Sequence, residues 1–223
     1  MIDQNADAIL REVRSLQEFA TAFSAVAQLP DPKLRPCDLP ALVENAGRLY
    51  HGATPVEFRV EAERPLPLAW ADESQIQRVL VNLIKNALEA SPERGRITLR
   101  VLRDATAGDG AVRLEVEDTG PGMDPATLER AATPGFTTKS TGSGLGLTLV
   151  QRIVEQHGGR FGIESHPGVG THAWVVLPAA PPGALADAPA DDAPVDAVPA
   201  DSAPGGSDPE PPGRAGERGA MPS

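Results

Sequence analysis

The chain has 223 residues, a formal net charge of -11 and 40% hydrophobic residues, which predicts a soluble protein with one fair-sized domain and appendages. No apolar run approaches the roughly 20 residues of a membrane span, the first residues lack a signal-peptide core, and the acidic balance disfavours nucleic acid as a partner. The single cysteine, Cys37, excludes an internal disulfide and suits a reducing, cytoplasmic compartment.

The first predicted element is a helix whose apolar residues recur at alternating steps of four and three. These residues are Ile2, Ala6, Ile9, Val13, Leu16, Ala20, Phe23 and Ala27. Such a seam is typical of a coiled coil or a helix bundle. Because one helix cannot bury this stripe alone, we expect it to pair with a partner helix or to pack on the domain that follows.

Helices and strands then alternate up to Pro178. Proline-rich "LPDPKLRP" ends the first helix. The predicted helices cover residues 39–50, 73–90, 125–131 and 144–159, with Asp38 and Asp72 as N-caps. The predicted strands cover residues 57–62, 65–71, 96–102, 112–118, 160–165 and 171–178. This order predicts an α+β fold, a two-layer α/β sandwich with helices on one face of a mixed sheet, preceded by the bundle helix.

Residues 179–223 are predicted to be a disordered tail. Ten of the 23 prolines lie there, with eight acidic residues against two arginines and no aromatic residue. Such a segment cannot bury enough apolar surface to offset the entropy of ordering. It is a spacer or, alternatively, an acidic docking tail. The predicted domains are therefore residues 1–35, 36–178 and 179–223.

Two asparagines one helical turn apart, Asn82 and Asn86, lie in the stretch "NLIKNALEAS". They fall away from the apolar stripe of their helix, which is formed by Ile76, Leu80, Leu83, Ile84 and Ala87. An asparagine carbonyl is a hard oxygen ligand that suits Mg²⁺ held jointly with substrate phosphates. A solvated polar face is the alternative.

A carboxylate and two glycines stand at the end of a predicted strand, in "VEDTGPGM". Gly120 and Gly122 allow a tight turn and the close approach of a ligand. The carboxylate of Asp118 could accept a hydrogen bond from an exocyclic amine. An ordinary turn is the alternative.

Three glycines precede the last long helix, in "TGSGLGLTLV". Bare N–H groups at a helix N-terminus form an anion site, and the spacing differs from that of the dinucleotide fingerprint and of the P-loop. The glycines are Gly142, Gly144 and Gly146. The segment before them, "PGFTTKST" with Phe136 and Lys139, is predicted to be a mobile lid.

In their order and spacing, these motifs resemble the ATP-binding domain of sensor histidine kinases, most closely of the nitrogen-regulation type. That domain belongs to the GHKL superfamily shared with gyrase, the mismatch-repair ATPases and the heat-shock chaperone ATPases. "NLIKNALEA" is similar to the asparagine box, "DTGPGM" and "GSGLGL" to the two glycine boxes, and "PGFTTK" to the phenylalanine box. The resemblance covers about residues 36–178 and implies the Bergerat-type ATP-binding fold.

On the phosphate side, the resemblance implies ATP and Mg²⁺ as ligands. Asn86 would bind Mg²⁺, Asn82 would face the phosphates and Lys139 could touch the γ-phosphate. The glycines that would close over the phosphates are Gly142, Gly144 and Gly146.

On the base side, Asp118 would accept the adenine amine, and Thr171 would reach the adenine through water. Gly120 and Gly122 would shape the turn around the base, and Met123 would line it.

The residue at position 82 separates two branches of the superfamily. The gyrase-like ATPases place a glutamate four residues before their metal asparagine, as the general base for water. Asn82 cannot take up a proton, so hydrolysis by water should be slow. The sequence instead indicates transfer of the γ-phosphate to an acceptor from outside.

No histidine has the surroundings of a phosphoacceptor, which is followed directly by Glu or Asp and then Asn-Pro. The four histidines are His51, His157, His166 and His172. We therefore identify no catalytic residue, and we expect the partners to be a phosphoacceptor histidine domain and a response regulator, with dimerisation through the N-terminal helix. The chain resembles a kinase that starts midway; a truncation, a misassigned start and a natural half-kinase stay open.

The alternative function is a nucleotide-binding regulatory module or an anti-sigma-type serine kinase. The N-terminal bundle helix favours the histidine kinase, because an anti-sigma kinase would not need it.

Overall fold

The computed structural model describes residues 20, 24, 28–52, 54–91, 95–106, 110–131, 133, 135–137 and 144–184. Most of the predicted N-terminal helix and of the predicted tail therefore lies outside the described residues. Across the described ranges, no helix is both long enough and apolar enough to span a membrane.

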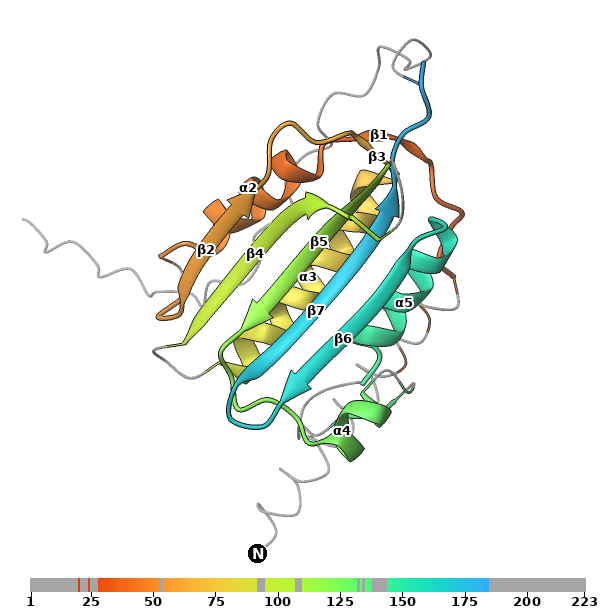
Figure 1. Cartoon of the computed structure of the whole chain (residues 1–223). Coiled ribbons are helices and arrows are strands. Elements are labelled where there is room, and N and C mark those ends of the chain that lie inside the picture. Colours follow the sequence, from red (N-terminus) through yellow and green to blue (C-terminus); the bar gives the residue numbers. More distant parts are fainter. Residues whose placement is uncertain are drawn as a thin grey trace, which may run out of the picture. The chain divides into compact units, whose positions relative to one another are not determined.

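Five strands of the described residues form one mixed sheet in the order β2-β4-β5-β7-β6 (Figure 1). They are β2 Glu57–Ala62, β4 Arg96–Arg103, β5 Ala111–Asp118, β6 Arg160–His166 and β7 Gly170–Pro178. β2 runs parallel to β4, and all other neighbours are antiparallel. A parallel pair needs a crossover connection, and the helix between β2 and β4 in the sequence provides it.

Three helices lie against one face of this sheet, behind it in Figure 1. They are α2 Leu39–Tyr50, α3 Glu73–Ala90 and α5 Gly146–Gln156; the short helix α4 Pro125–Arg130 lies near β6. The predicted apolar stripe of α3 is at most 3% exposed at every position. Fully burying a large aliphatic side chain contributes about 1.5–3 kcal/mol, so this helix is a main anchor of the core.

The other face of the sheet carries charged side chains and one tryptophan. The guanidinium of Arg100 lies between the carboxylates of Glu61, at 2.8 Å, and Glu117, at 2.5 Å. The guanidinium of Arg113 lies 4.6 Å from the ring centroid of Trp174. A face of this kind is not covered by a further layer in the described residues, so the fold is the predicted α+β sandwich of two layers.

A second, two-stranded sheet pairs β1 Arg35–Cys37 antiparallel with β3 Ala69–Ala71. Strand β1 is not predicted from the sequence, whereas a strand is predicted over residues 65–71. Pro65 and Pro67 have no backbone N–H to donate, so only the last three residues of that range form a strand.

Backbone pairing continues two residues beyond Pro178. Ala179 forms a bridge with Ala69, and the N–H of Ala180 donates to the carbonyl of Leu68 at 2.7 Å. The end of β7 is therefore tied to the small sheet.

Asp72 connects three segments of the chain. Its carboxylate accepts the N–H of Gln75, at 3.2 Å, as the N-cap of α3, and the N–H of Lys33, at 2.9 Å, in the segment that leads into β1. Its own N–H donates to Nε2 of the buried His157, at 3.0 Å, just after α5. Nδ1 of His157 lies 2.7 Å from the carbonyl of Ile153, so the proton belongs on Nδ1 and both ring nitrogens are occupied.

Candidate functional site

The two asparagines of α3 lie beside the first residue of α5. A Cβ built on Gly146 would lie 3.1 Å from Oδ1 of Asn82 and 4.0 Å from Nδ2 of Asn86. Nδ2 of Asn82 donates to the carbonyl of Arg78 at 2.8 Å. Both asparagines are half-buried, whereas the apolar stripe of α3 is buried. Glycine at position 146 allows the backbone of α5 to approach the two amides closely.

The start of α5 is a helix N-terminus without a side-chain cap. The N-cap residue is Leu145, whose buried aliphatic side chain cannot accept a hydrogen bond. The first N–H groups of a helix have no partner within the helix, so this end suits an anion. The helix begins at Gly146 and not at Gly144, two residues later than the sequence predicted.

The turn after β5 brings Asp118 and its glycines against two other segments. Asp118 is 6% exposed, and its Oδ1 accepts the N–H of Gly120 at 2.8 Å. A Cβ on Gly120 would lie 2.8 Å from the carbonyl of Ala90, at the end of α3. Gly122 has a φ of 66°, and a Cβ there would meet the carbonyl of His166, so only glycine fits.

Thr171 lies directly opposite Asp118 across β5 and β7, and Ser165 lies opposite Thr171 across β7 and β6. The hydroxyl oxygens of Ser165 and Thr171 are 3.0 Å apart. The N–H of Met123 donates to Oγ of Ser165 at 2.8 Å. The structure thus groups the predicted base-side residues at one end of the sheet.

Ser165 was missed by the sequence analysis. It is the last inward-facing position of β6, and the signal for it was the alternation in "RFGIES", which places Phe161, Ile163 and Ser165 on the same face.

Gly135, in the predicted lid segment, pairs with Gly144, three residues after that segment. The N–H of Gly135 donates to the carbonyl of Gly144 at 3.1 Å. The guanidinium of Arg130, in α4, lies 4.3 Å from the ring centroid of Phe136. Lys139 and Gly142, which the sequence analysis assigned to the phosphate side, lie outside the described residues.

No group of three or more His, Cys, Asp or Glu residues suited to a metal ion occurs in the part of the chain that the structure describes. Such a carboxylate cage is not what Mg²⁺ requires beside a nucleotide, where one or two protein oxygens and the substrate phosphates suffice. The amide of Asn86, next to the uncapped end of α5, fits that requirement.

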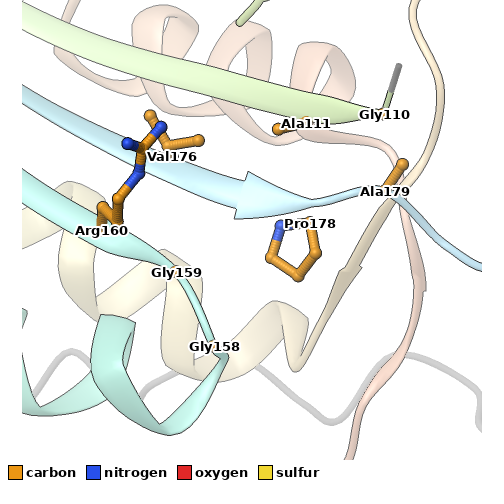
Figure 2. A pocket seen from close by; sticks show the side chains of 8 residues that line it. All are labelled: Gly110, Ala111, Gly158, Gly159, Arg160, Val176, Pro178 and Ala179. Atoms are coloured by element: carbon orange, nitrogen blue, oxygen red, sulfur yellow. The ribbon is translucent and has the colours of Figure 1, made fainter. Parts of the chain in front are cut away.

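One pocket lies at the opposite end of the sheet (Figure 2). It has a volume of about 370 Å³ and is lined mainly by glycine, alanine and proline, with Arg160 as the charged side chain. Ala111 lines it at the start of β5, seven residues before Asp118, which corresponds to roughly 23 Å along a strand. This pocket is therefore separate from the site at the asparagines.

These features together define a nucleotide-binding type of domain. They are the α+β sandwich, the asparagine amides of α3, the uncapped start of α5 and the carboxylate–glycine turn after β5. Residues 71–181 match the family described as "Histidine kinase-, DNA gyrase B-, and HSP90-like ATPase". The chain thus contains a histidine-kinase-type ATP-binding domain of this family.

Individual relatives agree with this assignment. The sensor protein FixL of Bradyrhizobium diazoefficiens is 38% identical over 185 residues, which cover 80% of this chain and 35% of FixL. The catalytic domain of histidine kinase ThkA is 28% identical with a TM-score of 0.58, covering 66% of this chain and 96% of that one. Full-length ShkA in complex with AMPPNP is 28% identical with a TM-score of 0.64, covering 76% of this chain and 36% of that one. This chain spans about a third of the length of FixL.

Proposed function

We propose that this chain is the ATP-binding catalytic part of a two-component sensor histidine kinase and transfers the γ-phosphate of ATP to a histidine outside the chain. The observation that carries the proposal is that Asn82 and Asn86 lie beside Gly146, at the start of α5, where no side chain caps the helix. This arrangement joins amide oxygens, which suit Mg²⁺, to N–H groups, which suit phosphate.

On the phosphate side, Asn86 would hold Mg²⁺ together with phosphate oxygens, and Asn82 would face the phosphates. The metal supplies neutralisation of the charge that develops on the phosphates during transfer. Gly144 and Gly146 would bring backbone N–H groups to the same oxygens. We retain Lys139 and Gly142 as further phosphate contacts on the resemblance alone.

The acceptor is proposed to be a histidine and not water. Activating water requires a group that takes up its proton, and an amide at position 82 cannot do so. Transfer to histidine breaks the bond between the γ-phosphorus and the β,γ-bridging oxygen and forms a phosphorus–nitrogen bond, and ADP leaves. His157 is excluded as the acceptor in the folded domain, because it is buried with both nitrogens in hydrogen bonds.

On the base side, we propose that Asp118 accepts the adenine amine, Thr171 binds beside it and Met123 lines the base. The partners would be a phosphoacceptor histidine domain and a response regulator, with dimerisation through the N-terminal helix. The reduced, buried Cys37 fits a cytoplasmic location.

Calorimetric titration with ATP, with and without Mg²⁺, tests the site. Asn86→Ala should lose the metal-dependent part of the affinity. Asp118→Asn should weaken ATP binding about 10- to 100-fold, because a hydrogen bond to a charged group contributes about 1.5–3 kcal/mol. Asn45→Ala, an exposed asparagine of α2, is the matched control and should bind as the wild type does. Unchanged ATP affinity in both site variants would contradict the proposal.

Labelled ATP tests the transfer. Incubated with a separately made acceptor hairpin, the chain should place acid-labile, base-stable phosphate on the hairpin and none on itself. Acid-stable phosphate would indicate a hydroxyl acceptor and favour the serine-kinase alternative. Labelled phosphate on one of the chain's own histidines would show that no outside acceptor is needed; these are His51, His157, His166 and His172.

A further inference from the structure

The hydroxyl of Ser165 takes part in three hydrogen bonds at the base end of the site. Ser165 is 8% exposed. Its Oγ lies 2.9 Å from the carbonyl of Gly170, 2.8 Å from the N–H nitrogen of Met123 and 3.0 Å from Oγ1 of Thr171.

The directions of these bonds follow from the number of protons. A carbonyl oxygen only accepts, so the single hydroxyl proton of Ser165 goes to Gly170. A backbone N–H only donates, so Met123 occupies one lone pair of Ser165. The contact with Thr171 then has only a lone pair on the Ser165 side, and Thr171 must be the donor.

Thr171 therefore has no proton left for a ligand. Its remaining lone pairs make it a hydrogen-bond acceptor toward anything else beside it. Asp118, directly opposite in the register, is a carboxylate and also accepts only when ionised. Side chains directly opposite in a sheet have their Cβ atoms about 4.5–5.5 Å apart, so the two acceptors face one ligand edge.

We propose that Ser165 is a positioning residue that fixes Thr171 as an acceptor and so makes this site select a purine with an amine at C6 over one with a carbonyl there. This inference rests on the proposed function, ATP binding. An amine donates to Asp118 and Thr171, directly or through a bridging water. A C6 carbonyl would face their lone pairs.

The test compares ATP with inosine triphosphate, which has a carbonyl in place of the C6 amine and a proton on N1. Affinities of both are measured with Mg²⁺ by competition against a fluorescent nucleotide. The variants are Ser165→Ala, Thr171→Val and the double variant. A fourth variant, Ser165→Thr, keeps a hydroxyl at position 165. Ser74→Ala, at the opposite end of α3, is the matched control, and melting curves report folding.

We expect Ser165→Ala to lower the ratio of ATP to inosine triphosphate affinity about fivefold, as the loss of one oriented hydrogen bond implies. Ser165→Thr should restore the ratio, and Ser165→Ala should change it no further in the Thr171→Val background. An equal loss of affinity for both nucleotides would mean that Ser165 only supports the fold, and would overturn the inference while leaving ATP binding intact. A wild-type chain that binds neither nucleotide would instead overturn the proposed function itself.

Discussion

Two side chains of the proposed site matter because of proton transfer and hydrogen-bond donation, respectively. Asn82 presents a carboxamide where a general base would be needed to activate water. Ser165 has a single proton, and the carbonyl of Gly170 takes it. In the proposed function, Asn82 restricts the reaction to acceptors other than water, and Ser165 restricts the choice of the purine base.

Cys37 is a residue whose chemistry depends on the small sheet. Burial, with further contributions from Glu73 and Asp38, raises the pKa of its thiol from 9.0 to about 12. The thiolate is the reactive form, so a disulfide reagent should label Cys37 only when β1 separates from β3 or the chain unfolds. The labelling rate should rise with urea in parallel with unfolding. Rapid stoichiometric labelling in native buffer would contradict this.

The same shift predicts a dependence of stability on pH. The folded pKa of Cys37 lies above the unfolded one, so its contribution is complete below about pH 9 and is lost as the pH rises toward 12. Urea unfolding of the wild type and of Cys37→Val at pH 8 and pH 10.5 measures it. The wild type should lose more stability between these values than the variant does, and an equal loss would refute the prediction.

At the scale of elements, the contacts of Asp72 are those whose removal should lower the free energy of unfolding most. Asp72→Ala removes the cap of α3 and the acceptor for Lys33, which should cost about 2 kcal/mol. Asp38→Ala removes a cap alone, with its bond to Ala41 at 3.0 Å, and should cost about 1 kcal/mol. Urea unfolding of both variants checks the difference. Equal losses would show that the bond to Lys33 adds nothing.

Acid should act on the same carboxylate. Burial alone would raise the pKa of Asp72, but hydrogen bonds from the Ser74 hydroxyl and from backbone N–H groups, including that of Lys33, outweigh burial and lower it from 3.8. A lowered folded pKa contributes stability above the unfolded value, and this is lost as the pH falls through the folded one. The stability difference between wild type and Asp72→Ala should therefore shrink below about pH 4.

Periodicity was enough to predict the elements that bury one face. The stripe of α3 and the alternation of β4 and β5 gave their positions within one or two residues. Strand β1 could not be predicted, because a three-residue strand has no measurable period, and only Ala69–Ala71 of the strand predicted over residues 65–71 forms β3. On the site, the asparagines and the glycine turns follow from local motifs, whereas the role of Ser165 depends on the register of β6 against β7.

At the scale of the molecule, two truncations separate the tail from the fold. Deleting residues 185–223 should leave the melting temperature and ATP binding unchanged, because the composition offers almost no core. Deleting residues 179–223 also removes two backbone hydrogen bonds. The N–H of Ala179 donates to the carbonyl of Gly110, and the N–H of Ala180 donates to the carbonyl of Leu68. Two bonds of about 1 kcal/mol each should lower the melting temperature by about 4–8 °C, with ATP binding retained. A large drop with the shorter deletion would show that the tail packs.

The apolar stripe near the N-terminus predicts self-association, although most of it lies outside the described residues. Leaving large apolar side chains in water is unfavourable by about 1.5–3 kcal/mol each. We expect a dimer or larger species at micromolar concentration by light scattering, and a monomer for the Leu16→Glu/Phe23→Glu double variant. A monomer in both cases would indicate that the stripe packs on its own ATP-binding domain.

The small sheet has a consequence for how this domain can be combined with others. Cys37 pairs with Ala69 on one side, and Ala69 bridges Ala179 on the other, so Cys37 and Ala179 lie about 10 Å apart, two strand spacings. A domain with adjacent entry and exit can be inserted into a loop of another protein as a cassette. It can also be circularly permuted by a short linker across that gap, with new ends opened elsewhere on its surface. The pairing of Ala69 with both segments therefore places Cys37 and Ala179 close enough for such a linker.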